Sequence, residues 1–145
     1  MRLVFLVNAA ATLAMFGVIL VVQQVHYPLF RGVGADGWVA YAAEHGRRMT
    51  PVVLPLMAAE LVTAALLVWN RPPWVPAAWA WVGLALVGVA WLSTAFVQVP
   101  LHARLGAGWD AAAHARLVST NAVRTAAWAL RSALVVWLLA RTFRP

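Results

Sequence analysis

The stretch LVFLVNAAATLAMFGVILVVQQV, residues 3–25, contains no acidic or basic side chain, and it decides the class of this protein. A helix rises about 1.5 Å per residue, so this stretch is long enough to cross about 30 Å of hydrocarbon. Three more apolar stretches follow, at about 51–69, 77–99 and 121–140. Together they predict an all-α fold, an up-and-down four-helix transmembrane bundle in which residues 1–145 form a single domain.

The composition of the chain excludes most soluble protein classes. Of its 145 residues, 64% are hydrophobic and 10% are charged, whereas soluble domains carry about 25% charged residues. The chain has no cysteine, which excludes a disulfide scaffold. The net charge of +7 comes from arginines scattered around the apolar stretches, where they meet lipid headgroups. We therefore expect the lipid bilayer as partner, and no nucleic acid.

The connections between the spans are of two kinds. Residues 70–76 form a short proline-rich turn. The connections at 26–50 and 100–120 are predicted to be long loops with short helical segments, whose N-caps are Asp36 and Asp110. The helix that begins at Asp110 can continue without a break into the fourth span. An even number of spans places both tails and the short turn on one side of the membrane, and both long loops on the other.

Arginine positions indicate the orientation. The tail side holds Arg2, Arg71, Arg141 and Arg144. The loop side holds Arg31, Arg47, Arg48, Arg104 and Arg116. Because the tail-side arginines lie in shorter segments, the positive-inside rule favours cytoplasmic tails in a cytoplasmic (inner) membrane.

The two halves of the chain resemble each other. The order Gln-Val, Pro-Leu, glycines, Trp and His-x-Arg occurs after the first span, ending at His45–Arg47, and again after the third, ending at His114–Arg116. This order predicts an internal repeat of two helical hairpins, related by a pseudo-twofold axis along the membrane normal.

Polar side chains follow helical spacing in every span. A polar side chain within lipid must face protein, water or headgroups, so this spacing predicts which face points inward. The stripes consist of Asn8, Thr12, Ile19, Gln23 and His26; Met57, Glu60 and Thr63; Trp91, Thr94, Gln98 and His102; and His114, Leu117, Asn121, Arg124, Trp128 and Arg131. They predict a partly polar interior that is richest toward the long loops.

Glu60 and Arg131 lie about equally deep in their spans. A charged side chain at the centre of a span costs about 2.5–3.5 kcal/mol on insertion scales. Pairing offsets this cost, and we therefore predict a structural ion pair between the two residues.

Arg124 has no carboxylate at its depth. One alternative is that its side chain extends to the headgroups. The other is that it forms a fixed positive charge inside the bundle, suited to a carboxylate, phenolate, oxyanion or haem propionate. In that case the candidate binding residues are Arg124, Asn121 and Gln98, together with Trp128 if its ring lines a cavity rather than packing in the core.

All four histidines lie on the long-loop side. His26 and His102 end the first and third spans, which lie diagonally in an up-and-down bundle. They are the candidate catalytic residues, because the pKa of histidine suits a general base near neutral pH. Alternatively His26 and His102, with His45 and His114, are ligands of a haem iron or another metal ion. The sequence identifies no cofactor.

The last third of the chain resembles the anthrone-oxygenase-like family of small four-span membrane proteins. The resemblance rests on Val99–His102, on Trp109 and on Thr120–Thr125, which contains an Asn-x-x-Arg sequence. His102 stands where family members have asparagine. The resemblance implies that Asn121 and Arg124 belong to the site. Most members of the family have no known function, and a few resemble cofactor-free oxygenases that act on polycyclic phenolic anthrones, so the resemblance identifies no substrate.

Three interpretations of the function follow. The first is a membrane-embedded small-molecule site, of an oxidoreductase or oxygenase acting on a hydrophobic phenolic or anionic substrate. The second is an electron carrier that binds haem b or a metal ion. The third is a structural or accessory subunit, in a homo-oligomer or a larger membrane complex.

Overall fold

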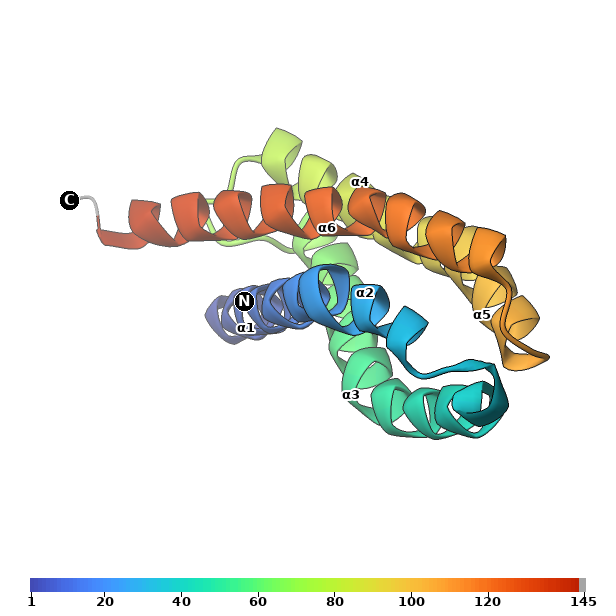
Figure 1. The fold of residues 1–145 in the computed structure, drawn as a ribbon. Helices are drawn as coiled ribbons and strands as arrows, with labels where there is room; N and C mark the ends of the chain where they lie inside the picture. The colour runs from blue at the N-terminus through green and yellow to red at the C-terminus, as the bar shows by residue number, and fades with distance from the viewer. Residues whose placement is uncertain (144–145) are drawn as a thin grey trace.

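The computed structural model describes residues 1–143, which fold into helices joined by short connections (Figure 1). Four helical segments are long and apolar enough to cross a membrane: Arg2–Gly32, Ala35–Trp69, Ala77–Gly106 and Ala111–Ala140. Large apolar side chains cover the outside of the bundle, and Leu3 and Phe96 are 73% and 74% exposed in the isolated chain. The protein is therefore a small integral membrane protein whose outer surface faces the lipid bilayer.

Two of the four segments are continuous helices, and two change helix type along their length. The first consists of α1 (Arg2–Val21), a π-helix (Val22–His26), α2 (Tyr27–Leu29) and a 3₁₀ turn (Phe30–Gly32). The second is α3 (Ala35–Trp69). The third consists of α4 (Ala77–Ser93), a π-helix (Thr94–Gln98) and α5 (Val99–Gly106). The fourth is α6 (Ala111–Ala140), which a 3₁₀ turn (Arg141–Phe143) follows.

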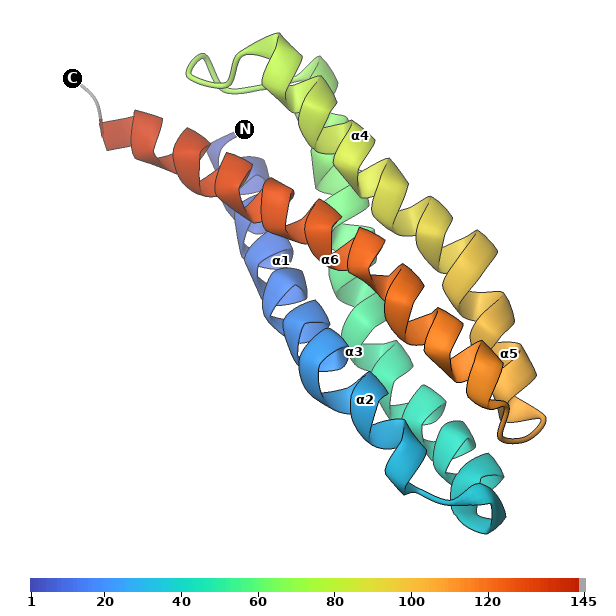
Figure 2. The same ribbon diagram turned by 45° about the horizontal axis from the view of Figure 1, so that its top comes forward.

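The helices form the predicted up-and-down bundle. Both α1 and α4 pack against α3 and against α6, so α1 and α4 lie diagonally, as do α3 and α6. The N-terminus, residue 143 and the 70–76 turn lie at one end, which we call the tail end (Figure 2). The connections at 33–34 and 107–110 lie at the other, which we call the loop end. Arg144 lies outside the described residues.

The prediction of two long loops is wrong, but the unbroken helix from Asp110 into the fourth span is confirmed by α6. α3 begins at Ala35, well before the expected start at Pro51, and continues through Pro51 and Pro55. A proline removes a backbone donor from a helix interior, and packing must compensate for this loss. The early turns of α3 are held by Trp38, which is 1% exposed and donates from Nε1 to the Leu105 carbonyl at 2.6 Å. This contact ties α3 to α5 beyond the apolar stretches.

The two predicted N-caps have different outcomes. Asp110 caps α6, because its side chain accepts a hydrogen bond from the Ala113 amide at 2.9 Å. That bond, with Arg104 nearby, lowers the pKa of Asp110 below its ordinary value of 3.8. Asp36 is not the N-cap of α3. Gly34 takes that position with φ of 83°, a left-handed conformation that favours glycine, and Asp36 lies in the first turn.

The two π-helices occupy corresponding positions in the two halves. Each ends two residues before a proline, Pro28 in the first half and Pro100 in the second. In each, an amide donates to the carbonyl five residues earlier: Tyr27 to Val22, and Val99 to Thr94. An inserted π turn rotates the residues that follow it relative to a regular α-helix. It therefore helps to set which side chains face inward at the loop end.

Candidate functional site

A polar network at mid-bundle connects all four spans. Arg131 donates from Nε to Glu60 Oε1 at 2.6 Å, and both side chains are at most 2% exposed. The pair joins α3 to α6, which are diagonal helices. From α1, Asn8 Oδ1 and Thr12 Oγ1 accept from Arg131 Nη2 at 3.0 and 3.2 Å.

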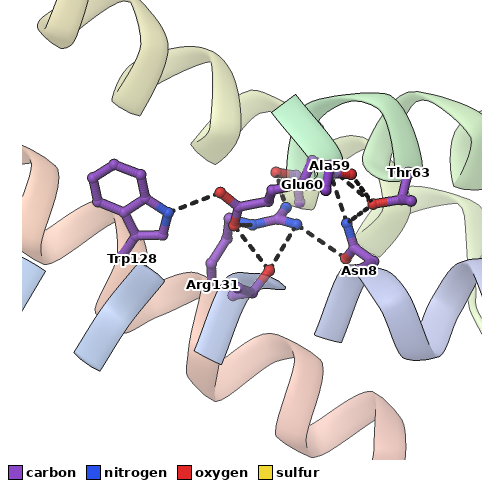
Figure 3. A network of polar contacts seen from close by, with 8 residues as sticks. Asn8, Ala59, Glu60, Thr63, Trp128 and Arg131 are labelled. Atoms are coloured by element: carbon purple, nitrogen blue, oxygen red, sulfur yellow. Dashed lines mark hydrogen bonds and ion pairs between the residues drawn. The ribbon is translucent and has the colours of Figure 1, made fainter. Parts of the chain in front are cut away.

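Both oxygens of the Glu60 carboxylate also accept hydrogen bonds within this network. Glu60 Oε1 accepts from Thr12 at 2.8 Å, and Glu60 Oε2 accepts from Trp128 Nε1 at 2.8 Å (Figure 3). From α4, the Gly83 carbonyl accepts from Arg131 Nη1. Every charged nitrogen and oxygen of the ion pair therefore has a protein partner, and only a cavity of about 20 Å³ lies beside it. This network has no free group to offer to a ligand.

Arg124 lies two turns nearer the loop end of α6, and its environment is different. Its side chain is 6% exposed, so it does not extend to the headgroups. Its Nη1 donates a long bond of 3.3 Å to Asn121 Oδ1, and its guanidinium lies 5.4 Å from the Trp128 ring centroid. Among residues 1–143 its Nε has no hydrogen-bond partner, and no carboxylate pairs with it.

A cavity of about 670 Å³ adjoins Arg124 in the loop-end half of the bundle. Most of its lining is apolar or aromatic, with Met15, Ile19 and Met57 among the buried residues. Its buried or half-buried polar lining comes from all four segments: Tyr27, His45, Thr94, Gln98, His102 and Arg124; the exposed Arg47 and Thr50 lie at its rim. This combination of an apolar wall and a few convergent polar groups is typical of small-molecule sites.

Two of these polar groups form a hydrogen-bonded pair. The Tyr27 hydroxyl lies 2.8 Å from His102 Nε2, and it also lies beside the Arg124 guanidinium. Gln98 donates to Thr120 Oγ1 at 3.0 Å, while its buried Oε1 has no partner among the described residues. The cavity therefore offers a fixed positive charge, an amide oxygen and a phenol–imidazole pair.

Two predicted site residues, Asn121 and Trp128, do not line the cavity and instead form hydrogen bonds with other side chains. Trp128 is fully buried, and its Nε1 is bonded to Glu60. Asn121 donates to Gln23 Oε1 at 2.8 Å and accepts from Arg124, so it holds that side chain in place. The spacing on α6 puts Asn121 and Trp128 on the inward stripe, but it does not tell a lining side chain from a packed one.

The histidines form a chain of aromatic contacts at the loop end. The His45 ring centroid lies 6.0 Å from that of His26 and 6.3 Å from that of His102. His114 does not line the cavity, and its Nε2 lies 2.7 Å from the Tyr27 carbonyl oxygen. Within residues 1–143, no group of three or more metal-ligating side chains is arranged to hold a metal ion. The predicted ligand set of His26, His45, His102 and His114 is therefore not gathered around one point, because His114 lies away from the cavity.

Sequence reasoning missed Tyr27. It stands four residues after Gln23 and thus continues the polar stripe of the first span, which is the signal that could have found it. The sequence also does not predict that the rings of Phe30 and Trp38 line the cavity, because both residues lie in the connection at 26–50, which is predicted to be a loop.

Comparison of the chain with protein-family models, with curated proteins and with solved structures finds no match.

Proposed function

We propose that this membrane protein binds a hydrophobic small molecule through its phenolic or anionic group, and that Arg124 holds that group. The observation that carries the proposal is the buried guanidinium with an unpartnered Nε beside a 670 Å³ cavity. A buried charge without a partner is costly. A phenolate or carboxylate in the cavity would supply the missing acceptor, and a charged hydrogen bond of this kind is strong.

Binding of two small probes tests this proposal. We would measure the binding of methyl 4-hydroxybenzoate and of benzoate by calorimetry, with the protein in lipid nanodiscs. Loss of one charged hydrogen bond costs about 1.5–3 kcal/mol, so Arg124→Gln should weaken binding about 10- to 100-fold. Arg116→Gln is the matched control, because Arg116 is an exposed arginine on the same helix. Equal affinities in the two variants would reject the role of Arg124.

The enzymatic form of the proposal is an oxygenase that acts on a phenolic substrate, as the family resemblance implies. Oxygenation without a cofactor requires a base that removes a proton, so that the anion can pass electrons to dioxygen. His102 is our candidate, because it lines the cavity and its Nε2 lies 2.8 Å from the Tyr27 hydroxyl. His26 does not line the cavity and contacts it only through the ring of His45, so we do not give it the role of the base. Dioxygen uptake with an anthrone, in wild type and His102→Gln, tests this form.

We also propose the duplicated-hairpin origin and the cytoplasmic position of the tails. The matching π-helices before Pro28 and Pro100 support the duplication. The absence of cysteine makes the orientation simple to test, because a single cysteine introduced at Thr142 or at Ala107 can be labelled from one side of the membrane only. Labelling at Thr142 from the periplasmic side would reverse the proposed orientation.

A further inference from the structure

The cavity has a mouth on one side of the bundle. Its exposed lining residues lie on α3, between Val39 and Leu54, and on α5, between Val99 and Gly106. The lining residues that the other described segments contribute are buried or half-buried. The cavity therefore opens between α3 and α5, toward whatever surrounds the bundle there.

Small and apolar residues form most of this mouth, and the exposed side chains of Arg47 and Thr50 complete it. Ala43 and Gly46 on α3 face the same opening as Ala103 on α5. Apolar side chains flank it, and Val39 and Leu54 are 50% and 53% exposed. Small residues between membrane helices usually allow the helices to come into close contact. Here they border an open cavity, and their side chains are too short to fill the opening.

The mouth lies at the edge of the hydrocarbon. Glu44 binds Arg47 and Arg48 on the outer turns of α3, and this exposed ionic cluster belongs at headgroup level. Leu54 lies about two turns further along, inside the apolar stretch. A molecule in the mouth would thus meet headgroups at one side and lipid chains at the other, while Arg124 lies at the buried side of the cavity.

From this arrangement we infer that the ligand is a single-chain amphiphile, which enters from the bilayer. This inference rests on the proposed function, because it gives the phenolic or anionic head group to Arg124. The alkyl or isoprenoid tail runs out between α3 and α5 and ends among the lipid chains. The cavity encloses the head and the first part of the tail.

Two esters with the same head group test the position of the tail. Methyl and dodecyl 4-hydroxybenzoate are titrated into the full-length protein in nanodiscs of one lipid composition. Ala43→Trp puts a bulky ring in the mouth. Ala40→Trp is the matched control, because Ala40 is an exposed alanine one turn earlier on α3 that does not line the cavity. Ala103→Trp repeats the test from the α5 side.

The expected result is selective loss of the long-chain ligand. Relative to Ala40→Trp, both mouth variants should weaken the dodecyl ester at least tenfold, with the methyl ester changed less than twofold. Partition of each ester into the nanodisc cancels, because each ester is compared only with itself. An unchanged dodecyl affinity would overturn the inference, and so would equal loss of both esters. Failure of both esters to bind the wild type would instead reject the proposed function.

Discussion

Arg124 and Arg131 lie on the same face of α6, two turns apart, and both side chains are nearly inaccessible. Arg131 has a carboxylate at 2.6 Å and partners from the other three spans, whereas Arg124 has one long bond to Asn121 and an unpartnered Nε. Beside Arg131 there is space for about one water molecule, and beside Arg124 there is a cavity of about 670 Å³.

This difference separates two uses of buried charge. Removing one partner of a buried ion pair is strongly destabilising, because the other charge is left uncompensated. A buried charge that has no carboxylate partner already bears part of that cost in the ligand-free protein, and a bound anion can relieve it. We therefore assign stability to the Arg131 network and propose ligand binding for Arg124, and variants of Glu60, Gly83 and Arg124 test this contrast directly.

The largest effect is expected at Glu60. Glu60→Gln removes the negative charge that compensates the buried charge of Arg131. We expect the free energy of unfolding to fall by about 3–5 kcal/mol. Denaturant unfolding in detergent micelles measures it. The double variant Glu60→Gln with Arg131→Met should recover most of this loss, because no charge is then left unpaired. A single variant as stable as wild type would contradict the structural role of the pair.

A smaller effect is expected where the network contacts α4. A Cβ at Gly83 would lie 3.2 Å from Arg131 Nη1, which cannot move away because it donates to the Gly83 carbonyl. Gly83→Ala should therefore lower the free energy of unfolding by about 1–2 kcal/mol.

Gly88 provides the control on the same helix, because a Cβ there meets nothing within 4 Å. Gly88→Ala should stabilise α4 by about 0.5–1 kcal/mol, as alanine does in a helix interior. If Gly83→Ala were as stable as Gly88→Ala, the network would be looser than its distances indicate.

A still smaller change in stability is expected at Arg124. Arg124→Met removes an under-partnered charge and keeps an apolar side chain of similar length, so the free energy of unfolding should stay within about 1 kcal/mol of wild type. The same unfolding assay measures it. A loss of more than about 2 kcal/mol would assign Arg124 a structural role like that of Arg131.

The smallest effect concerns an exposed carboxylate at the loop end. The Ala113 amide and Arg104 lower the pKa of Asp110 below 3.8 in the folded protein. Its stabilising contribution is therefore present above its ordinary pKa, and it is lost as pH falls through the lower folded pKa. The difference in unfolding midpoint between wild type and Asp110→Asn should shrink as pH falls from about 6 to about 3. A constant difference would show that the charge of Asp110 does not contribute.

The spacing of residues along each helix predicted the inward stripes well. Asn8, Glu60, Gln98, Asn121 and Arg131 are each at most 3% exposed. Lipid excludes unpaired polar groups, so a regular helix has only one direction in which such side chains can point. The shared depth of Glu60 and Arg131 follows from the same arithmetic, because helical rise converts residue number into depth.

Helical spacing did not predict which inward residues belong to the Glu60 network and which line the cavity. Trp128 belongs to the Glu60 network and Tyr27 to the cavity, although both lie on inward stripes. Which helix face meets which partner depends on the tilt of α6 and on the π turns before Tyr27 and Val99. These are relations between helices, and periodicity within one helix does not contain them.

Hydrophobicity and helical period are local properties, so the residues alone are enough to predict four membrane-crossing helices, their up-and-down order and the faces they bury. The enclosure of Arg131, the cavity beside Arg124 and the extension of α3 to Ala35 are properties of the packed bundle. These outcomes depend on how closely four helices pack at each level of the bundle. That packing is set by contacts between residues far apart in the chain, such as Trp38 with Leu105.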